Sequence, residues 1–139
     1  MLVHATTVDV AGLGVLMLGE AGSGKSDLAL RLIAEGALLV ADDQTWIEVV
    51  DGQLRASAPP SIRGLIEQRG VGIVRAPTKR ATWLRLAVAL SAAPERMPEP
   101  SAWSLPNTDG PRLPLLSLNP LETSAPAKLR AALAVVPRA

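Results

Sequence analysis

The chain has no cysteine, no phenylalanine and no tyrosine, and it has three tryptophans among 139 residues. The absence of cysteine excludes a disulfide framework and any metal site built on thiolates. Because aromatic side chains are few while 48% of the residues are apolar, leucine, valine, isoleucine and alanine must fill the core. We expect residues 1–139 to form a single domain, because a chain of this length can bury about two-thirds of its unfolded surface.

An excess of charge of either sign is also missing. Fourteen basic and thirteen acidic residues leave a formal net charge of +1. The chain therefore lacks the excess of basic residues that is typical of a nucleic-acid-binding domain. No lysine or arginine precedes Lys25, and His4 and Asp9 break the apolar N-terminal region, so the sequence predicts neither a signal peptide nor a membrane span. We therefore expect a cytoplasmic protein with no nucleic-acid or membrane partner.

Short apolar stretches separated by turns predict the elements of the first half. Residues 8–10 and 15–18 read as strands joined at "AGLG", where Gly12 and Gly14 can adopt the positive φ of a tight reversal. The stretch "KSDLALRLIAEG" has apolar residues at helical spacing and a final glycine, which predicts a helix and its stop. The run "ALLVADD" then predicts a buried strand that ends in two carboxylates.

The second half gives weaker signals. An Asp-Gly pair in "WIEVVDGQLRAS" predicts a hairpin, and the alternation in "TWLRLAVAL" favours a strand, although its spacing also suits a helix. Nine of the twelve prolines lie from Pro94 onward, so residues 94–124 are expected to be a long, mostly extended and mobile connection. A helix is predicted in "SAPAKLRAALAVV", with Ser124 or a neighbour as N-cap and Pro126 in its first turn.

The most specific motif is "GEAGSGKS", which fits G-x-x-x-x-G-K-[ST] between a predicted strand and a predicted helix. Glycines let the backbone N–H groups converge on phosphate oxygens at a helix N-terminus. Lysine in this motif reaches the β and γ phosphates, and the serine hydroxyl binds Mg²⁺. The nucleotide-binding residues are therefore expected to be Gly19, Glu20, Ala21, Gly22, Ser23, Gly24, Lys25 and Ser26. A plain glycine-rich turn before a helix is the alternative.

Two adjacent carboxylates, Asp42 and Asp43, end the strand that follows this helix. Neighbouring side chains on a strand point to opposite faces, so both can approach one site only at the end of the strand. One could hold a metal ion while the other accepts a hydroxyl proton. A helix or turn cap is the alternative for the second aspartate.

Other polar residues carry less specific signals. Arg63, Glu67 and Arg69 could neutralise a phosphoryl group or bind a metal, although such a segment is more often a solvated surface. His4 is the only histidine, and a lone histidine near a terminus is usually incidental. Trp46, Trp83 and Trp103 are interpreted as packing residues, since no basic residues interleave among them.

Taken in order, the motifs of residues 4–76 resemble the bacterial HPr kinase/phosphorylases. The matching residues are His4, "GVLMLGEAGSGKSD", "LVADD" and "EQRGVGI". The resemblance implies an α/β fold of the P-loop kinase type, with a mixed central sheet and flanking helices. It also implies an enzyme that uses ATP and Mg²⁺ to phosphorylate a regulatory serine of the phosphocarrier protein HPr, with a role in regulating the phosphotransferase system and carbon metabolism. In the family the same site also removes that phosphate with inorganic phosphate.

Carried over by position, the resemblance makes His4 and Lys25 catalytic or phosphate-contacting groups and makes Ser26 and Glu67 Mg²⁺ ligands. One aspartate becomes the general base, and we favour Asp43 with Asp42 nearby. Arg96 in "ERMP" is a weak match to a catalytic arginine of the family. Ring-like homo-oligomers are common in the family, so oligomerisation is implied by resemblance alone.

Departures from the family pattern qualify these expectations. The family's additional N-terminal domain has no counterpart here, so the chain looks like the short form found in some bacteria. Asp27 replaces the usual glutamate after the serine, and the C-terminal "PVxPGRN" pattern linked to phosphorolysis is not found in "LPLLSLNPLETSAPAKLR". Kinase activity is therefore expected more firmly than phosphorylase activity. The alternatives are a small-molecule kinase and an ATP-binding sensor without catalysis.

Overall fold

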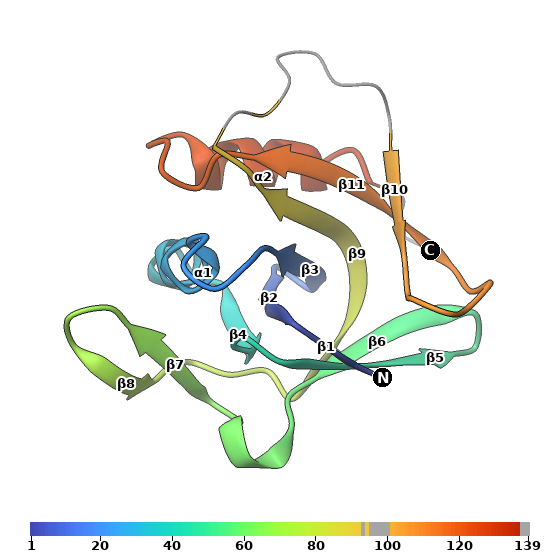
Figure 1. The fold of residues 1–139 in the computed structure, drawn as a ribbon, viewed down its shortest axis with the longest axis horizontal. Helices are drawn as coiled ribbons and strands as arrows, with labels where there is room; N and C mark the ends of the chain where they lie inside the picture. The colour runs from blue at the N-terminus through green and yellow to red at the C-terminus, as the bar shows by residue number, and fades with distance from the viewer. Residues whose placement is uncertain (93, 95–100, 137–139) are drawn as a thin grey trace.

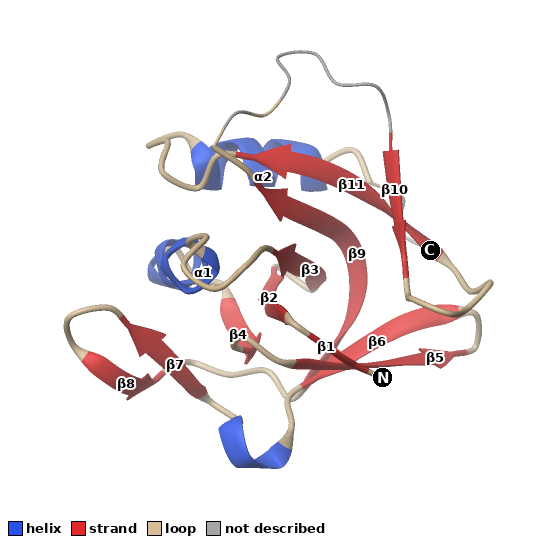
Figure 2. Cartoon of the chain, viewed as in Figure 1, coloured by secondary structure: helices blue, strands red, loops and turns tan. Residues whose placement is uncertain are grey.

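The computed structural model describes residues 1–92, 94 and 101–136. Nine strands form one mixed sheet: β1 (Leu2–Val3), β2 (Ala5–Val10), β3 (Leu13–Leu18), β4 (Leu38–Ala41), β5 (Thr45–Val50), β6 (Gln53–Ser57), β9 (Ala81–Leu90), β10 (Ser101–Ser104) and β11 (Arg112–Leu118). The remaining elements are the ribbon of β7 (Leu65–Gln68) and β8 (Gly72–Arg75), the helices α1 (Lys25–Ala34) and α2 (Ala125–Leu133), and the 3-10 helix η1 (Pro60–Ile62). The α/β class with a mixed sheet is thus confirmed (Figures 1 and 2).

The strand order is β1-β5-β6-β9-β3-β2-β4, and β11 pairs with both β9 and β10. Strand β9 is the centre of this sheet. It runs parallel to β3 and β11 and antiparallel to β6. Figure 1 shows β9 curving strongly between the β5–β6 side and the α2 side. Residues 82–90 are therefore strand, and the helical alternative is wrong.

A two-residue turn closes the predicted N-terminal hairpin. Strands β2 and β3 pair from Ala5↔Leu18 to Val10↔Leu13, and Ala11 and Gly12 both have positive φ, 52° and 88°. Such values match the twist of an antiparallel pair. Gly14, however, is not a turn residue: a Cβ there would lie 2.6 Å from the carbonyl oxygen of Trp83. Its small size, and not a positive φ, is what this position requires.

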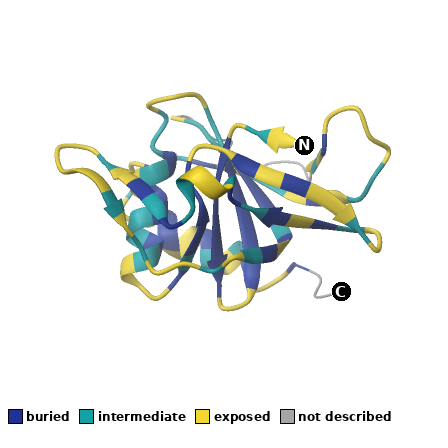
Figure 3. Ribbon diagram, turned by 90° about the horizontal axis from the view of Figure 1, so that it is seen from below, coloured by how far each residue is buried: buried dark blue, intermediate teal, exposed yellow. Residues whose placement is uncertain are grey.

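Two apolar cores lie on opposite faces of the curved sheet. Along β3, Val15 and Met17 belong to the core that α1 and α2 cover, whereas Leu16 belongs to the core beneath β5, β6 and β9. This alternation follows from the two-residue period of a strand. Figure 3 shows the central strands buried while the loops and strand tips around them are exposed. In place of phenylalanine and tyrosine, leucine and valine fill much of the first core, and leucine, isoleucine and alanine fill the second.

Helix α1 ends as its sequence predicts. Gly36 has a φ of 108°, its N–H donates to Ile33 O, and the N–H of Ala37 donates to Leu32 O. These bonds satisfy carbonyls that the end of the helix leaves free. Neither α1 nor α2, the α-helices of the described residues, has the length and apolar character needed to cross a bilayer.

The expectation of one long connection over residues 94–124 needs correction. Strands β10 and β11 lie within it and form an antiparallel pair, and β11 continues the main sheet beside β9. Proline is tolerated there because Pro114 faces Ala102 on one side, while β9 pairs only with residues 115–118 of β11. Helix α2 follows with Pro126 in its first turn and Ser124 at the N-cap, although the Ser124 side chain makes no capping hydrogen bond.

Candidate active site

The segment Gly19–Ser26 is a tight loop that joins β3 to α1. A Cβ at Gly19 would lie 2.3 Å from Ser23 Oγ, and Gly24 has a φ of 103°. The Ser23 hydroxyl is buried and has no hydrogen-bond partner among the described residues. The loop thus has no room for side chains where the motif has glycine, and it holds an unpaired hydroxyl at the N-terminus of α1.

Lys25 folds back over this loop. Its side chain is 5% exposed, and its Nζ donates to the carbonyl oxygens of Gly19 at 2.6 Å and Glu20 at 3.1 Å. The same Nζ lies 3.9 Å from Asp43 Oδ1. A buried ammonium group is therefore held between the loop and a carboxylate that comes from the end of β4.

Asp42 is fixed by three hydrogen bonds. Its Oδ1 accepts from Ser26 Oγ at 2.7 Å and from Thr6 Oγ1 at 3.1 Å, and its Oδ2 accepts from the backbone N–H of Glu67 at 3.0 Å. These donors come from α1, β2 and β7. The carboxylate therefore has little freedom to change direction.

Asp43 has a different environment. Its carboxylate is 59% exposed, and Oδ1 lies 2.7 Å from Nε2 of His4. Its backbone has a φ of 66°, and its N–H donates to Thr6 Oγ1 at 3.0 Å. A positive φ is uncommon for residues with a side chain, and such values concentrate at functional sites. Here it turns the chain so that the second carboxylate faces His4 and Lys25.

Strand pairing explains why residues distant in sequence meet here. Strand β2 pairs antiparallel with β4, and Thr7 lies opposite Ala41. The start of β2, with His4 just before it, is therefore placed beside the two aspartates that follow β4. Hydrophobic contacts of Leu28 and Leu32 hold α1 against the first core, which fixes Lys25 and Ser26 at the same edge.

Thr6 is a site residue that the sequence did not reveal. It is fully buried, and its hydroxyl donates to Asp42 and accepts from the backbone of Asp43. A threonine in a strand is common, so only its position two residues after His4 could have drawn attention to it. It links the two aspartates and fixes them relative to each other.

The far side of the loop is closed by the segment between β11 and α2. The ring of Pro120 lies 3.1 Å from where a Cβ of Gly24 would be. Arg31 of α1 donates to the carbonyl oxygens of Pro120 and Glu122, the latter at 3.2 Å. These contacts tie the C-terminal part of the described chain to the Gly19–Ser26 loop, and no sequence pattern indicated them.

The oxygen donors at this edge suit a magnesium ion. The described residues contain no group of three or more His, Cys, Asp or Glu side chains that could hold a metal. Mg²⁺, however, is usually bound by one or two carboxylates together with substrate phosphates and water. The Ser26 hydroxyl and the Asp42 carboxylate, 2.7 Å apart, are donors of that kind. Glu67 reaches Asp42 through its backbone N–H, so a ligand role for its side chain stays a prediction.

Other predicted residues lie elsewhere. Arg69 is in the turn between β7 and β8, and Arg63 follows η1. Arg96 lies outside the described residues. The packing interpretation holds for Trp103, which contacts the second core. Trp46 and Trp83 remain 43% and 38% exposed.

Asp9, at the opposite end of β2 from His4, is a buried carboxylate outside this site. Its Oδ2 accepts from Thr82 Oγ1 at 2.6 Å and from Lys79 Nζ at 3.1 Å, and its Oδ1 accepts from the N–H of Gly12 at 2.8 Å. Burial acts to raise the pKa of Asp9, but these hydrogen bonds and the charge of Lys79 hold it below its ordinary value of 3.8. The ionised carboxylate is therefore part of the folded structure.

Comparisons with known proteins identify relatives. Residues 1–80 match the model of the HPr Serine kinase C-terminal domain. An HPr kinase/phosphorylase of Clostridium novyi is 49% identical over 74 residues, which are 53% of this chain and 24% of the relative. One from Thermoanaerobacter sp. is 51% identical over 73 residues, 52% of this chain and 24% of the relative. The chain thus spans about a quarter of the length of these curated relatives.

A solved structure extends the likeness over nearly the whole chain. The Hpr(Ser) kinase/phosphatase from Coxiella burnetii superposes with a TM-score of 0.80 and 28% identity, covering 96% of this chain and 94% of that one. The similarity in fold therefore includes β10, β11 and α2, which lie beyond the residues matched by the family model.

Proposed function

The chain belongs to the HPr serine kinase C-terminal domain family, and on that premise we propose that it transfers the γ-phosphoryl group of ATP to a serine of an HPr-type phosphocarrier protein. The observation that carries this proposal is the convergence of His4, Lys25 and Asp43 above the Gly19–Ser26 loop. The names of the relatives support the choice of acceptor.

The first half of the mechanism is the binding of ATP and Mg²⁺. Backbone N–H groups of the Gly19–Ser26 loop and the N-terminus of α1 are suited to hold phosphates. On phosphate binding, Lys25 would exchange its bonds to the Gly19 and Glu20 carbonyls for phosphate oxygens. Ser26 and Asp42 would hold the metal, whose charge offsets that of the phosphates. The fixed carboxylate of Asp42 makes it the better metal residue of the two aspartates.

The second half is proton removal. As the serine oxygen forms its bond to the γ-phosphorus, the bond from that phosphorus to the ADP oxygen breaks and the serine proton passes to Asp43. Asp43 suits this role because its carboxylate is exposed, whereas that of Asp42 is enclosed by three donors. His4 holds one oxygen of Asp43 and leaves the other free to accept the proton. In reverse, an oxygen of inorganic phosphate would form a bond to the phosphorus of phosphoserine while the bond from that phosphorus to the serine oxygen breaks. Pyrophosphate would leave, and protonated Asp43 would return the proton to the serine oxygen.

The test is incubation of the purified chain with HPr from the same organism, ATP and Mg²⁺, followed by intact-mass measurement of HPr. We expect one added phosphate on a serine, and none with Lys25→Ala. Omitting Mg²⁺ should abolish transfer as well. ATP binding by the wild-type chain without any phosphate on HPr would contradict the proposal and favour a sensor or a kinase for another acceptor.

A further inference from the structure

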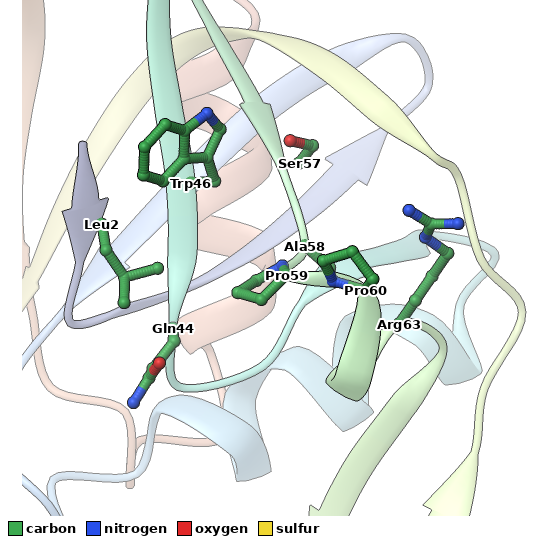
Figure 4. A pocket seen from close by; sticks show the side chains of 8 residues that line it. All are labelled: Leu2, Gln44, Trp46, Ser57, Ala58, Pro59, Pro60 and Arg63. Atoms are coloured by element: carbon green, nitrogen blue, oxygen red, sulfur yellow. The ribbon is translucent and has the colours of Figure 1, made fainter.

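A groove lies beside the candidate active site, on the face formed by β1, β5 and the residues around η1 (Figure 4). Its volume is about 490 Å³, which falls in the range of roughly 300–1,000 Å³ found for ligand pockets. The side chains that define its character are Leu2, Gln44, Trp46, Pro59, Pro60 and Arg63. None of them takes part in the nucleotide site described above.

The groove is lined by residues that are close in the chain to His4 and Asp43. Gln44 is the residue after Asp43, and Leu2 is two residues before His4. Strands β1 and β5 pair so that Leu2 lies opposite Trp46. An acceptor placed with its serine oxygen at Asp43 therefore has its neighbouring residues next to this groove, because an extended chain advances only about 3.3–3.6 Å per residue.

The surface of the groove is apolar, exposed and preformed. Leu2 is 49% exposed and Trp46 43% exposed, and they lie opposite each other on paired strands, so they form one continuous apolar surface of the kind that marks an interaction site. The indole N–H of Trp46 donates to Glu48 Oε1 at 3.0 Å, which fixes the orientation of the ring. Pro59 and Pro60 have restricted backbones, so little conformational entropy is lost when a ligand binds.

A positively charged side chain, that of Arg63, lies at the edge of this apolar surface. The guanidinium of Arg63 has no hydrogen bond or ion pair within the described part of the chain and lines the groove together with Pro60 (Figure 4). An apolar floor with a few polar groups at the rim is the usual composition of a recognition site. It is not a second phosphate site, because η1, which lines it, is a single 3-10 turn of three residues, and no glycine among the described residues lines it.

We propose that this groove binds an apolar side chain of the protein substrate, one to a few residues from the serine that is phosphorylated. Arg63 donates to a carbonyl or carboxylate oxygen of the same substrate segment. The inference rests on the proposed function, because it requires a protein acceptor. It assigns Trp46 as a determinant of substrate specificity that stands outside the catalytic residues.

The experiment measures steady-state transfer to HPr by the wild-type chain and by Trp46→Ala, with ATP affinity measured separately. The KM for HPr should rise on the order of tenfold in Trp46→Ala, because tryptophans that become buried on binding contribute much of the binding energy of an interface. The affinity for ATP should stay unchanged. Trp83→Ala is the matched control: Trp83 is similarly exposed, on β9, and does not line the groove. Leu2→Ser is a second variant. Leu2 begins the two-residue strand β1, where a substitution is least expected to prevent folding, and the KM for HPr should rise in this variant as well.

Each outcome decides a separate point. A KM for HPr that is unchanged in both Trp46→Ala and Leu2→Ser, with wild-type transfer intact, overturns the groove assignment and leaves the proposed function standing. Loss of a dimer or larger assembly in sedimentation of Trp46→Ala, with unchanged KM, overturns it in favour of a second copy of this chain as the occupant. Absence of transfer by the wild-type chain removes the proposed function and the groove assignment together.

Discussion

His4 and Asp43 are 39 residues apart in the sequence, yet Nε2 of His4 lies 2.7 Å from Oδ1 of Asp43. The contact depends on antiparallel pairing of β2 with β4 and on the positive φ of Asp43. Adjacent Asp42 is turned the other way and bonded to Ser26, Thr6 and Glu67. Two neighbouring carboxylates therefore have separate environments, one enclosed and one exposed.

Replacing His4 by alanine should slow transfer to HPr by about ten- to a hundredfold, because Asp43 loses the partner that orients it, and general-base catalysis as a whole contributes about 10²–10⁴-fold. ATP affinity should remain near wild type, since the side chain of His4 is bonded to Asp43 and not to a residue of the Gly19–Ser26 loop. Single-turnover transfer and equilibrium ATP binding measure the two effects. A loss of ATP binding equal to the loss of rate would contradict a role in orienting the base.

Thr6→Val should destabilise the fold by about 1–3 kcal/mol, because the backbone N–H of Asp43 and one oxygen of Asp42 lose a buried partner. Thr6→Ser keeps the hydroxyl and should retain most of the stability and the activity. Urea denaturation of both variants checks this. Equal stability of the valine and serine variants would show that the hydroxyl is not needed.

Stability should depend on Asp9 in acid. The folded state lowers the pKa of Asp9 below 3.8, so the ionised form stabilises the fold. The contribution is fully present above the unfolded pKa and is lost as the pH falls through the lower folded value. Asp9→Asn should therefore cost about 1–2 kcal/mol at pH 7, with the difference from wild type shrinking below about pH 4. Urea midpoints at pH 7, 5 and 3 test this; a difference that grows towards acid would contradict it.

Arg31→Ala should weaken ATP binding several-fold without touching a catalytic group. Arg31 holds the carbonyls of Pro120 and Glu122, and Pro120 packs against Gly24 of the loop. Arg31→Lys, which keeps the charge but loses the two-pronged donor, should fall between wild type and alanine. Calorimetric titration with ATP checks this order. Wild-type affinity in Arg31→Ala would show that the segment after β11 does not support the loop.

Local signals in the sequence were enough for the elements built from neighbouring residues. The turn at Gly12, the Asp51–Gly52 hairpin of β5 and β6, and the end of α1 at Gly36 all follow from residues a few positions apart. Strand pairing over long distances left no such signal. The proline-rich stretch was therefore expected to be a connection, although β11 pairs with β9.

The roles of the candidate site residues stay predictions, and nothing in the sequence indicated how these side chains are arranged. The phosphate-loop motif and the family resemblance named His4, Lys25, Ser26, Asp42 and Asp43, and the structure brings these side chains together. Thr6 and Arg31 were missed because their partners are carboxylate and carbonyl oxygens from other strands and loops. Only the fold shows which aspartate is enclosed and which is exposed.

The central claim is that Asp43 accepts the serine proton. The most direct measurement is the single-turnover rate of phosphate transfer to HPr by Asp43→Asn, with ATP affinity determined on the same preparation. Asparagine keeps the shape of the side chain and removes the base, so the rate should fall by about 10²–10⁴-fold while ATP still binds. Transfer at the wild-type rate by Asp43→Asn, with Asp42→Asn inactive, would contradict the claim and move the proton acceptor to Asp42.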